Sequence, residues 1–242
     1  MRRFIVLLTV IVLLLIVADR AAWWTAQRGL ATAIQNSQNL TERPTVHVAG
    51  FPFLTQALGG RYQQVDADIS DLSVQNGLTV NKLHVRLRGV RVKAGDLIKG
   101  QVSKAPVDEA SAVATVSYAS LDAVAKTNIP DDRLKVKFGP GQGQLLSITG
   151  SYASALIKVQ VKAQAQVSVK DGDLAVGLMP ASLASLPASI RAQVTSLFDG
   201  GAYRLPKLPL GFEAKTVTVG PDGVTVSAAA TSVELTQQQP AQ

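Results

Sequence analysis

The sequence predicts an α+β protein in which a long, coiled antiparallel β-sheet wraps on helices, preceded by an N-terminal transmembrane helix. The first observation is a period of two in the apolar pattern from about residue 45 onward, typical of strands with one buried and one solvated face. The second is a set of dipeptides between these segments that suit tight hairpin turns. The third is an apolar run close to the N-terminus.

The N-terminal run has the composition of a membrane-spanning helix. Two arginines precede the 15 residues from Phe4 to Ala18, of which Thr9 is the only polar one, and Asp19 follows directly. As a helix this run is about 22 Å long, short of the roughly 30 Å hydrocarbon core of a bilayer. Extending the helix to Trp23 and Trp24 adds aromatic residues typical of membrane interfaces and nearly completes a span.

A cleaved signal peptide is the alternative for residues 1–24. Cleavage requires small residues at positions −3 and −1, and cuts after Ala18, Ala21 or Ala22 all fail this rule. We therefore expect an uncleaved anchor, with Arg2 and Arg3 holding the N-terminus in the cytoplasm. The chain is then a single-pass protein of the cell membrane, with its C-terminal domain on the extracytoplasmic side.

After the anchor, we expect a folded α+β domain over residues 25–234 and a disordered, glutamine-rich tail over residues 235–242. Apolar residues at helical spacing predict a helix over residues 20–40. Three antiparallel hairpins follow, which pair Tyr62–Val74 with Leu78–Lys93, Ile157–Lys170 with Asp173–Leu178, and Phe212–Val219 with Val224–Val233.

The alternation of the first hairpin changes phase in both strands, near Ser70–Asp71 and near Gly89. A slip of one residue moves every later side chain to the opposite face, so each change predicts a β-bulge. Because bulges bend and twist strands, we expect the sheet to coil around other elements. Two helical segments are candidates: Ser120–Lys126, after a short strand at Ala112–Ser117, and Ala181–Phe198, which Pro187 divides into two short helices.

Composition and motifs argue against several classes of function. The net charge is +7, but aromatic residues are only 5% and scattered, unlike the stacking surfaces of nucleic-acid-binding proteins. Without cysteine there are no disulfides or thiol nucleophiles, and His47 and His84 have no partners at metal-ligand spacing. The sequence contains no nucleophile-elbow, phosphate-loop or zinc-protease motif, and Asp66 and Asp68 would share a solvated strand face. We therefore expect no enzyme activity, metal or cofactor.

The connection between the first two strands carries the most specific pattern in the chain. Residues 50–56 read GFPFLTQ, and Gly60 opens the next strand. Together with VSYASL at residues 116–121 and LPKLPLGF at residues 205–212, this order of motifs resembles the LmeA-like phospholipid-binding family of actinobacterial cell-envelope proteins. The resemblance covers nearly the whole chain. It implies lipid binding outside the cytoplasm by a curved sheet similar to tubular lipid-binding modules, with a role in lipoglycan elongation, and it supplies no catalytic motif.

We therefore expect a membrane-anchored, extracytoplasmic phospholipid-binding protein that holds acyl chains in an apolar groove and serves cell-envelope lipid or lipoglycan assembly in the periplasm. Burial of a chain of ~16 carbons gives a gross gain of about 12 kcal/mol. The expected partners are phospholipid, of the anionic kind that suits dispersed positive charge, and the cytoplasmic membrane, without nucleic acid. The alternatives are an enzyme or enzyme accessory acting on envelope glycolipids, and an anchor that binds protein.

An apolar connection is tolerated where it faces an interior or an acyl chain. Pro52 suits the first turn of a short helix that sets Leu54 and Leu58 on one face and caps the sheet as plug and gate, with ordinary core packing as the alternative. The expected lipid contacts are apolar side chains of this connection, of one strand face and of the second helical segment: Phe51, Pro52, Phe53, Leu54, Leu58, Leu83, Val85, Leu87, Leu183, Leu186, Ile190, Leu197 and Phe198.

The strand from Leu83 to Lys93 also carries a basic stripe. We expect Arg86, Arg88 and Arg91 to hold anionic headgroups or the membrane surface, since each arginine contributes about 1 kcal/mol near such a surface and pairs phosphate bidentately. A solvated stripe without a specific role is the alternative.

Overall fold

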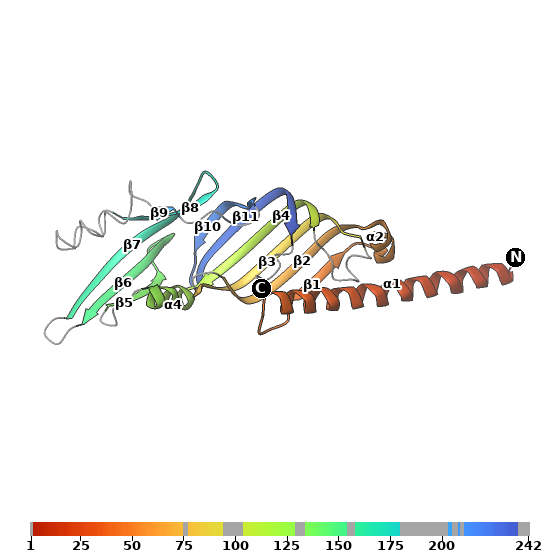
Figure 1. Ribbon diagram of the computed structural model, residues 1–242, viewed down its shortest axis with the longest axis horizontal. Coiled ribbons are helices and arrows are strands. Elements are labelled where there is room, and N and C mark those ends of the chain that lie inside the picture. The colour runs from red at the N-terminus through yellow and green to blue at the C-terminus, as the bar shows by residue number, and fades with distance from the viewer. Residues whose placement is uncertain are drawn as a thin grey trace. The chain divides into compact units, whose positions relative to one another are not determined.

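Figure 1 shows the computed structural model of the 242-residue chain. The structure describes residues 2–74, 77–93, 104–128, 134–153, 158–179, 203–204, 208 and 211–236. The chain divides into two compact units. Unit 1 consists of residues 1–69, 84–111 and 230–242, and unit 2 consists of residues 70–83 and 112–229.

A six-stranded antiparallel sheet has the order β1-β2-β3-β4-β11-β10 (Figure 1). Its two edge strands, β1 and β10, do not pair with each other, so the sheet is open. Its strands are β1 (Thr45–Ala49), β2 (Arg61–Ser73), β3 (Thr79–Arg91), β4 (Lys104–Ser117), β10 (Glu213–Val219) and β11 (Gly223–Thr236).

A second antiparallel sheet lies within unit 2 and has the order β5-β6-β7-β8-β9. Its strands are β5 (Leu134–Pro140), β6 (Leu145–Ala153), β7 (Lys158–Lys170), β8 (Asp173–Leu178) and β9 (Tyr203–Arg204). Leu146 and Ala165 from this sheet are buried with Val219 of β10 and form a core cluster of unit 2. Helix α4 (Tyr118–Asn128) packs on this cluster through Tyr118 and Leu121.

The three predicted hairpins are confirmed: β2 pairs with β3, β7 with β8, and β10 with β11. In the second hairpin, Asp171 and Gly172 have φ values of 55° and 80°, as a tight turn of this kind requires. β11 continues to Thr236, so the strand includes the first two residues of the predicted tail, and residues 237–242 lie outside the described residues.

Backbone irregularities occur where the phase changes predict bulges. Asp71 and Gly89 have φ values of 49° and 64°, in the left-handed region. At Gly89 a side chain would also overlap the carboxylate of Asp108 on the neighbouring strand β4, so glycine satisfies two constraints there. β11 has a similar irregularity at Ser232, with a φ of 53°, where the buried positions change phase between Ala230 and Val233.

The observed helices agree with those predicted from the sequence, with one difference. Instead of an anchor followed by a separate helix over residues 20–40, one continuous helix α1 runs over Arg2–Ser37, because no helix-breaking residue separates the two apolar patterns. α2 is Phe53–Gly59, and α4 confirms the predicted helix at Ser120–Lys126. The predicted strand Ala112–Ser117 is the second half of β4, and Ala181–Phe198 lies outside the described residues. The α+β class is confirmed.

Candidate functional site

The first half of α1 exposes its apolar side chains. Its large apolar side chains from Phe4 to Val17 are each at least 40% exposed, and Figure 1 shows this half of the helix beyond the end of β1. α1 is long and apolar enough to cross a membrane, a property that signal sequences near an N-terminus share. The helix therefore fits a single-pass membrane anchor or a signal segment.

The folded part of unit 1 begins directly after this apolar run, at Asp19. The Asp19 side chain is only 4% exposed; its Oδ1 accepts the backbone N–H of Leu54 at 2.7 Å, and its Oδ2 accepts from Arg20 at 2.9 Å. Two charge-assisted bonds compensate the buried carboxylate. The Arg20 guanidinium also lies 5.0 Å from the ring centre of Phe51 and 5.1 Å from that of Trp23. These five residues are called the α1–α2 junction below.

Trp23 attaches α1 to the edge of the six-stranded sheet. Its indole N–H donates to the backbone carbonyl of Val48 at 2.7 Å, and its ring meets His47 edge to face at 5.8 Å. Val48 belongs to the edge strand β1, so the indole ties α1 to the edge of the sheet. The predicted interfacial pair is therefore divided: Trp23 is bound to the fold, whereas Trp24 is exposed.

Polar residues of the GFPFLTQ motif hold α2 in place. The buried Gln56 side chain donates to the Ala49 carbonyl at 3.3 Å and accepts the backbone N–H of Gln63 at 3.0 Å, so it joins α2 to both β1 and β2. Gly50 has a φ of 103°, and a Cβ there would overlap the Gln56 amide. Glycine and glutamine in this motif are thus required by the backbone of the connection.

The structure separates the apolar residues predicted in this connection. Phe53 is 6% exposed and packs on Tyr62, with ring centres 6.2 Å apart, so it belongs to the core of unit 1. Leu54 is half-buried, and Pro52 is exposed and extended just before the first turn of α2. Phe51 and Leu58 are 60% and 88% exposed.

The predicted apolar strand face exists on β1, β2 and β3. The register of β1 with β2 places Val46 opposite Ala67 and Val48 opposite Val65, on one face. Ion pairs of Asp66 with Arg86 and of Asp68 with His84 lie on the other face. By alternation, Leu83, Val85 and Leu87 share the apolar face of β3, and all three are half-buried. The remaining predicted contacts, Leu183, Leu186, Ile190, Leu197 and Phe198, lie outside the described residues.

Each arginine of the predicted basic stripe has a carboxylate neighbour. Arg86 pairs with Asp66 of β2 at 2.6 Å, Arg88 lies 3.6 Å from Glu109 of β4, and Arg91 pairs with Asp108 of β4. The three arginine side chains are about half exposed. The surface is therefore a set of cross-strand ion pairs, in which much of the positive charge is offset.

Asp66 is more enclosed than a solvated strand face predicts, with 13% of its side chain exposed. Burial raises the pKa of Asp66, but hydrogen bonds from Gln64 and Arg86 and the charge of Arg86 outweigh burial and hold that pKa below its usual range. Asp66 is therefore an ionised partner of Arg86. This ion pair accounts for the lowered pKa as a structural feature, with no role in proton transfer needed to explain it.

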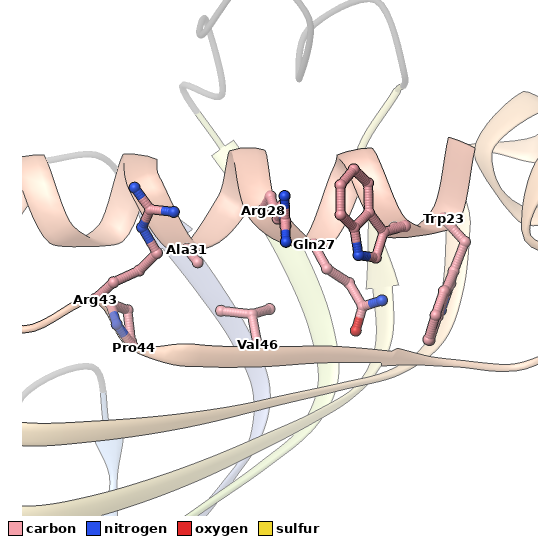
Figure 2. Close-up of a pocket in the computed structure, with 8 residues that line it drawn as sticks. Trp23, Gln27, Arg28, Ala31, Arg43, Pro44 and Val46 are labelled. Carbon is pink, nitrogen blue, oxygen red and sulfur yellow. The ribbon is translucent and has the colours of Figure 1, made fainter. Parts of the chain in front are cut away.

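A groove of about 500 Å³ lies between α1 and the chain entering β1 (Figure 2). In Figure 2, Trp23 reaches from α1 toward the strand, and Val46 points from the strand toward the helix. The Arg28 guanidinium stacks 3.5 Å from the ring centre of Trp24, and Arg43 Nε lies 3.5 Å from the Gln35 amide oxygen. The lining residues are Trp23, Trp24, Gln27, Arg28, Ala31, Arg43, Pro44 and Val46.

Within the part of the chain that the structure describes, Arg28 and Arg43 form no ion pair with a carboxylate. The groove therefore combines aromatic surface with two positive charges that have no carboxylate partner among the described residues. No pattern in the sequence predicted this groove. The i, i+4 spacing of Trp24 and Arg28 is the signal that could have drawn attention to it.

A model of a protein family described as LmeA-like phospholipid-binding matches residues 17–229. The matched region begins just before Asp19 and includes the α1–α2 junction, the apolar strand face and the groove. No curated protein and no solved structure matches the chain. Among the described residues, no cluster of three or more His, Asp or Glu side chains could hold a metal ion.

Proposed function

Because the chain belongs to the LmeA-like phospholipid-binding family, we propose that it is a membrane-anchored protein that binds phospholipid on the extracytoplasmic side of the cell membrane. Family membership supports the lipid class, and the apolar helix α1 is compatible with the anchor. The observation that carries the anchor is the buried hydrogen bond from Leu54 to Asp19. Cleavage after Ala21 or Ala22 would remove Asp19, a buried partner of α2, and the cut after Ala18 fails the small-residue rule, so the two observations together support retention of α1.

The apolar face of β1, β2 and β3 is the proposed site for an acyl chain. Val85 and Leu87 are half-buried there, so they retain apolar surface that a lipid would cover. Each CH₂ group transferred from water contributes about 0.8 kcal/mol, so even partial burial of an acyl chain against this face stabilises the complex by several kcal/mol.

The proposed headgroup site is the α1–β1 groove. Arg28 and Arg43 bring positive charge without a described carboxylate partner, whereas Arg86, Arg88 and Arg91 already face acidic side chains. An anionic phospholipid satisfies this charge without first displacing an internal partner. The groove also lies within the first turns of α1 after Asp19, near the depth of headgroups if the apolar run spans the bilayer.

We propose that this lipid binding serves the assembly of lipids or lipoglycans in the cell envelope. The protein would hold lipid for other components, without a reaction of its own. An enzyme or an enzyme accessory acting on envelope glycolipids remains the second candidate.

The function is tested on the full chain, extracted from membranes in detergent. Native mass spectrometry and a lipid extract of the purified protein are expected to show phospholipid bound in a defined ratio. Phospholipid no higher than in a detergent blank would contradict binding, and turnover of labelled glycolipid by the purified chain would favour the enzyme. N-terminal sequencing tests the anchor, which is refuted by a mature chain that begins after Ala18.

A further inference from the structure

We propose that α2 is a second membrane contact, which lies in the headgroup layer beside α1 and inserts Phe51 and Leu58 toward the acyl chains. The proposal rests on the proposed membrane anchoring of α1. It is independent of where phospholipid binds within the fold.

The first observation is the distribution of exposed apolar side chains. Among the described residues of unit 1, the large apolar side chains that are strongly exposed lie in the apolar run of α1 or at three other positions: Trp24, Phe51 and Leu58. Leu58, at 88%, is the most exposed of them. Trp24 lies on α1 itself, Phe51 lies over Arg20, and Leu58 lies on α2, whose first turn is bonded to Asp19. Exposed apolar groups gathered in one place indicate an interaction surface.

The second observation fixes the level of α2 along α1. The hydrogen bond from Leu54 to Asp19 ties the first turn of α2 to the residue that ends the apolar run. If α1 spans the bilayer, Asp19 marks the depth at which the helix leaves the hydrocarbon. α2 must then lie at the membrane boundary, because it has no freedom to move away from Asp19 without breaking this bond.

The third observation is the length of the apolar run. From Phe4 to Ala18 it measures about 22 Å as a helix, against a hydrocarbon thickness of roughly 30 Å. A short span is accommodated by local thinning of the bilayer or by drawing flanking residues toward it. Phe51 and Leu58 are flanking apolar residues in three dimensions, although they are more than 30 residues away in sequence. They extend the apolar surface of α1 at the end where the span is incomplete.

Arg20 fits this location. Its guanidinium lies against the rings of Trp23 and Phe51 and pairs with Asp19, so it can remain near the polar layer while its neighbours contact lipid. The occupant of the α2 surface is therefore a lipid bilayer, the same one that α1 enters.

The chain contains no cysteine, so one introduced cysteine is a unique labelling site. The full-length variant Leu58→Cys carries a nitroxide spin label and is reconstituted into vesicles of phosphatidylcholine and phosphatidylglycerol. Ser37→Cys is the matched control, because it is exposed and lies at the other end of the folded part of α1, about 27 Å from Asp19 along the helix. Collision rates are measured with oxygen, which concentrates in the bilayer, and with a water-soluble nickel chelate.

We expect the label at residue 58 to be protected from the nickel chelate several-fold relative to residue 37 and to collide more often with oxygen. Equal nickel accessibility at the two positions would overturn the proposal. Carbonate extraction of the same vesicles separates the two possible failures. If carbonate removes the protein, the anchor and the α2 contact both fail; if the protein stays while residue 58 is accessible to nickel, only the α2 contact fails.

Discussion

Within one short connection, neighbouring phenylalanines have different structural roles. Phe53 packs on Tyr62 in the core of unit 1, whereas Phe51 is mostly exposed and lies over Arg20. Removal of a packed phenylalanine leaves a cavity and costs about 3–5 kcal/mol, whereas surface substitutions typically change stability by less than about 0.5 kcal/mol.

We therefore predict that Phe53→Ala lowers the urea midpoint of the detergent-solubilised full chain strongly and that Phe51→Ala leaves it nearly unchanged. Circular dichroism across a urea series measures both. Similar losses for the two variants would mean that Phe51 is also part of the core.

Asp66 gives unit 1 a predictable response to acid. Its pKa is lowered in the folded state, while in the unfolded chain it titrates near the usual value of ~3.9. The ionised carboxylate thus contributes stability above about pH 4, and this contribution is lost as the pH falls through the lower folded pKa.

We predict that Asp66→Asn is less stable than the wild-type chain at pH 7 and that the difference shrinks toward pH 3. Urea unfolding at several pH values measures this convergence. Asp68→Asn serves as the control, because it removes the same charge from a more exposed position on the same strand. A difference between wild type and Asp66→Asn that stays constant with pH would argue against an ionised, stabilising Asp66.

At the scale of elements, a β-bulge can be inferred from a phase change, but its energy depends on the neighbouring strand. Gly77 and Gly89 both have positive φ, at 73° and 64°. A Cβ at Gly77 would meet nothing within 4 Å, whereas a Cβ at Gly89 would overlap Asp108. A substitution at Gly77 therefore introduces backbone strain alone, whereas one at Gly89 introduces backbone strain and steric overlap with Asp108.

We predict that Gly77→Ala costs about 1 kcal/mol from the left-handed backbone alone and that Gly89→Ala costs at least ~2 kcal/mol. Chemical denaturation of both variants tests the difference. If the two losses are equal, Asp108 moves aside without cost and the overlap at the bulge contributes nothing.

The elements themselves were largely predictable, because their signals are local. Alternation and turn dipeptides identified three antiparallel pairs, and the phase changes located Asp71 and Gly89, but strands β5 and β6 and the division of the strands into two sheets were not predicted. The anchor and the helix over residues 20–40 were predicted separately, and the structure joins them in one helix, α1. The orientation of α2 was also beyond the sequence: which of its apolar residues are buried depends on Gln56 and on the strands to which it binds.

At the scale of the whole molecule, positive charges that are close in sequence do not form one basic surface, because each is paired with a carboxylate from another strand. Arg86, Arg88 and Arg91 form a basic stripe in sequence, yet strands β2 and β4 supply a carboxylate for each of them. Arg28 and Arg43 are 15 residues apart and line the same groove only because β1 runs back along α1. Pairing across strands and the α1–β1 groove are both tertiary, so neither could be found from residue spacing alone.

This difference gives opposite expectations for two sets of variants. In Arg28→Gln/Arg43→Gln, two charges without a described carboxylate partner are lost, and at about 1 kcal/mol each this weakens binding of anionic lipid by up to about 30-fold. In Arg86→Gln/Arg88→Gln/Arg91→Gln, the charges lost are already paired, so we predict a smaller change in lipid affinity and a loss of stability, because Asp66 is left without its partner.

Binding of fluorescent phosphatidylglycerol to the full chain in detergent, measured across a salt series, compares the two sets, with zwitterionic phosphatidylcholine as the control without net charge. The groove variant should show a shallower salt dependence for phosphatidylglycerol and an unchanged affinity for phosphatidylcholine, since screening acts only on the charges that the lipid meets. If the triple variant loses the salt dependence while the groove variant keeps it, the headgroup binds along β3, as the basic stripe in the sequence predicts. The ion pairs seen there would then have to open when lipid arrives, and the groove would be a packing feature of α1.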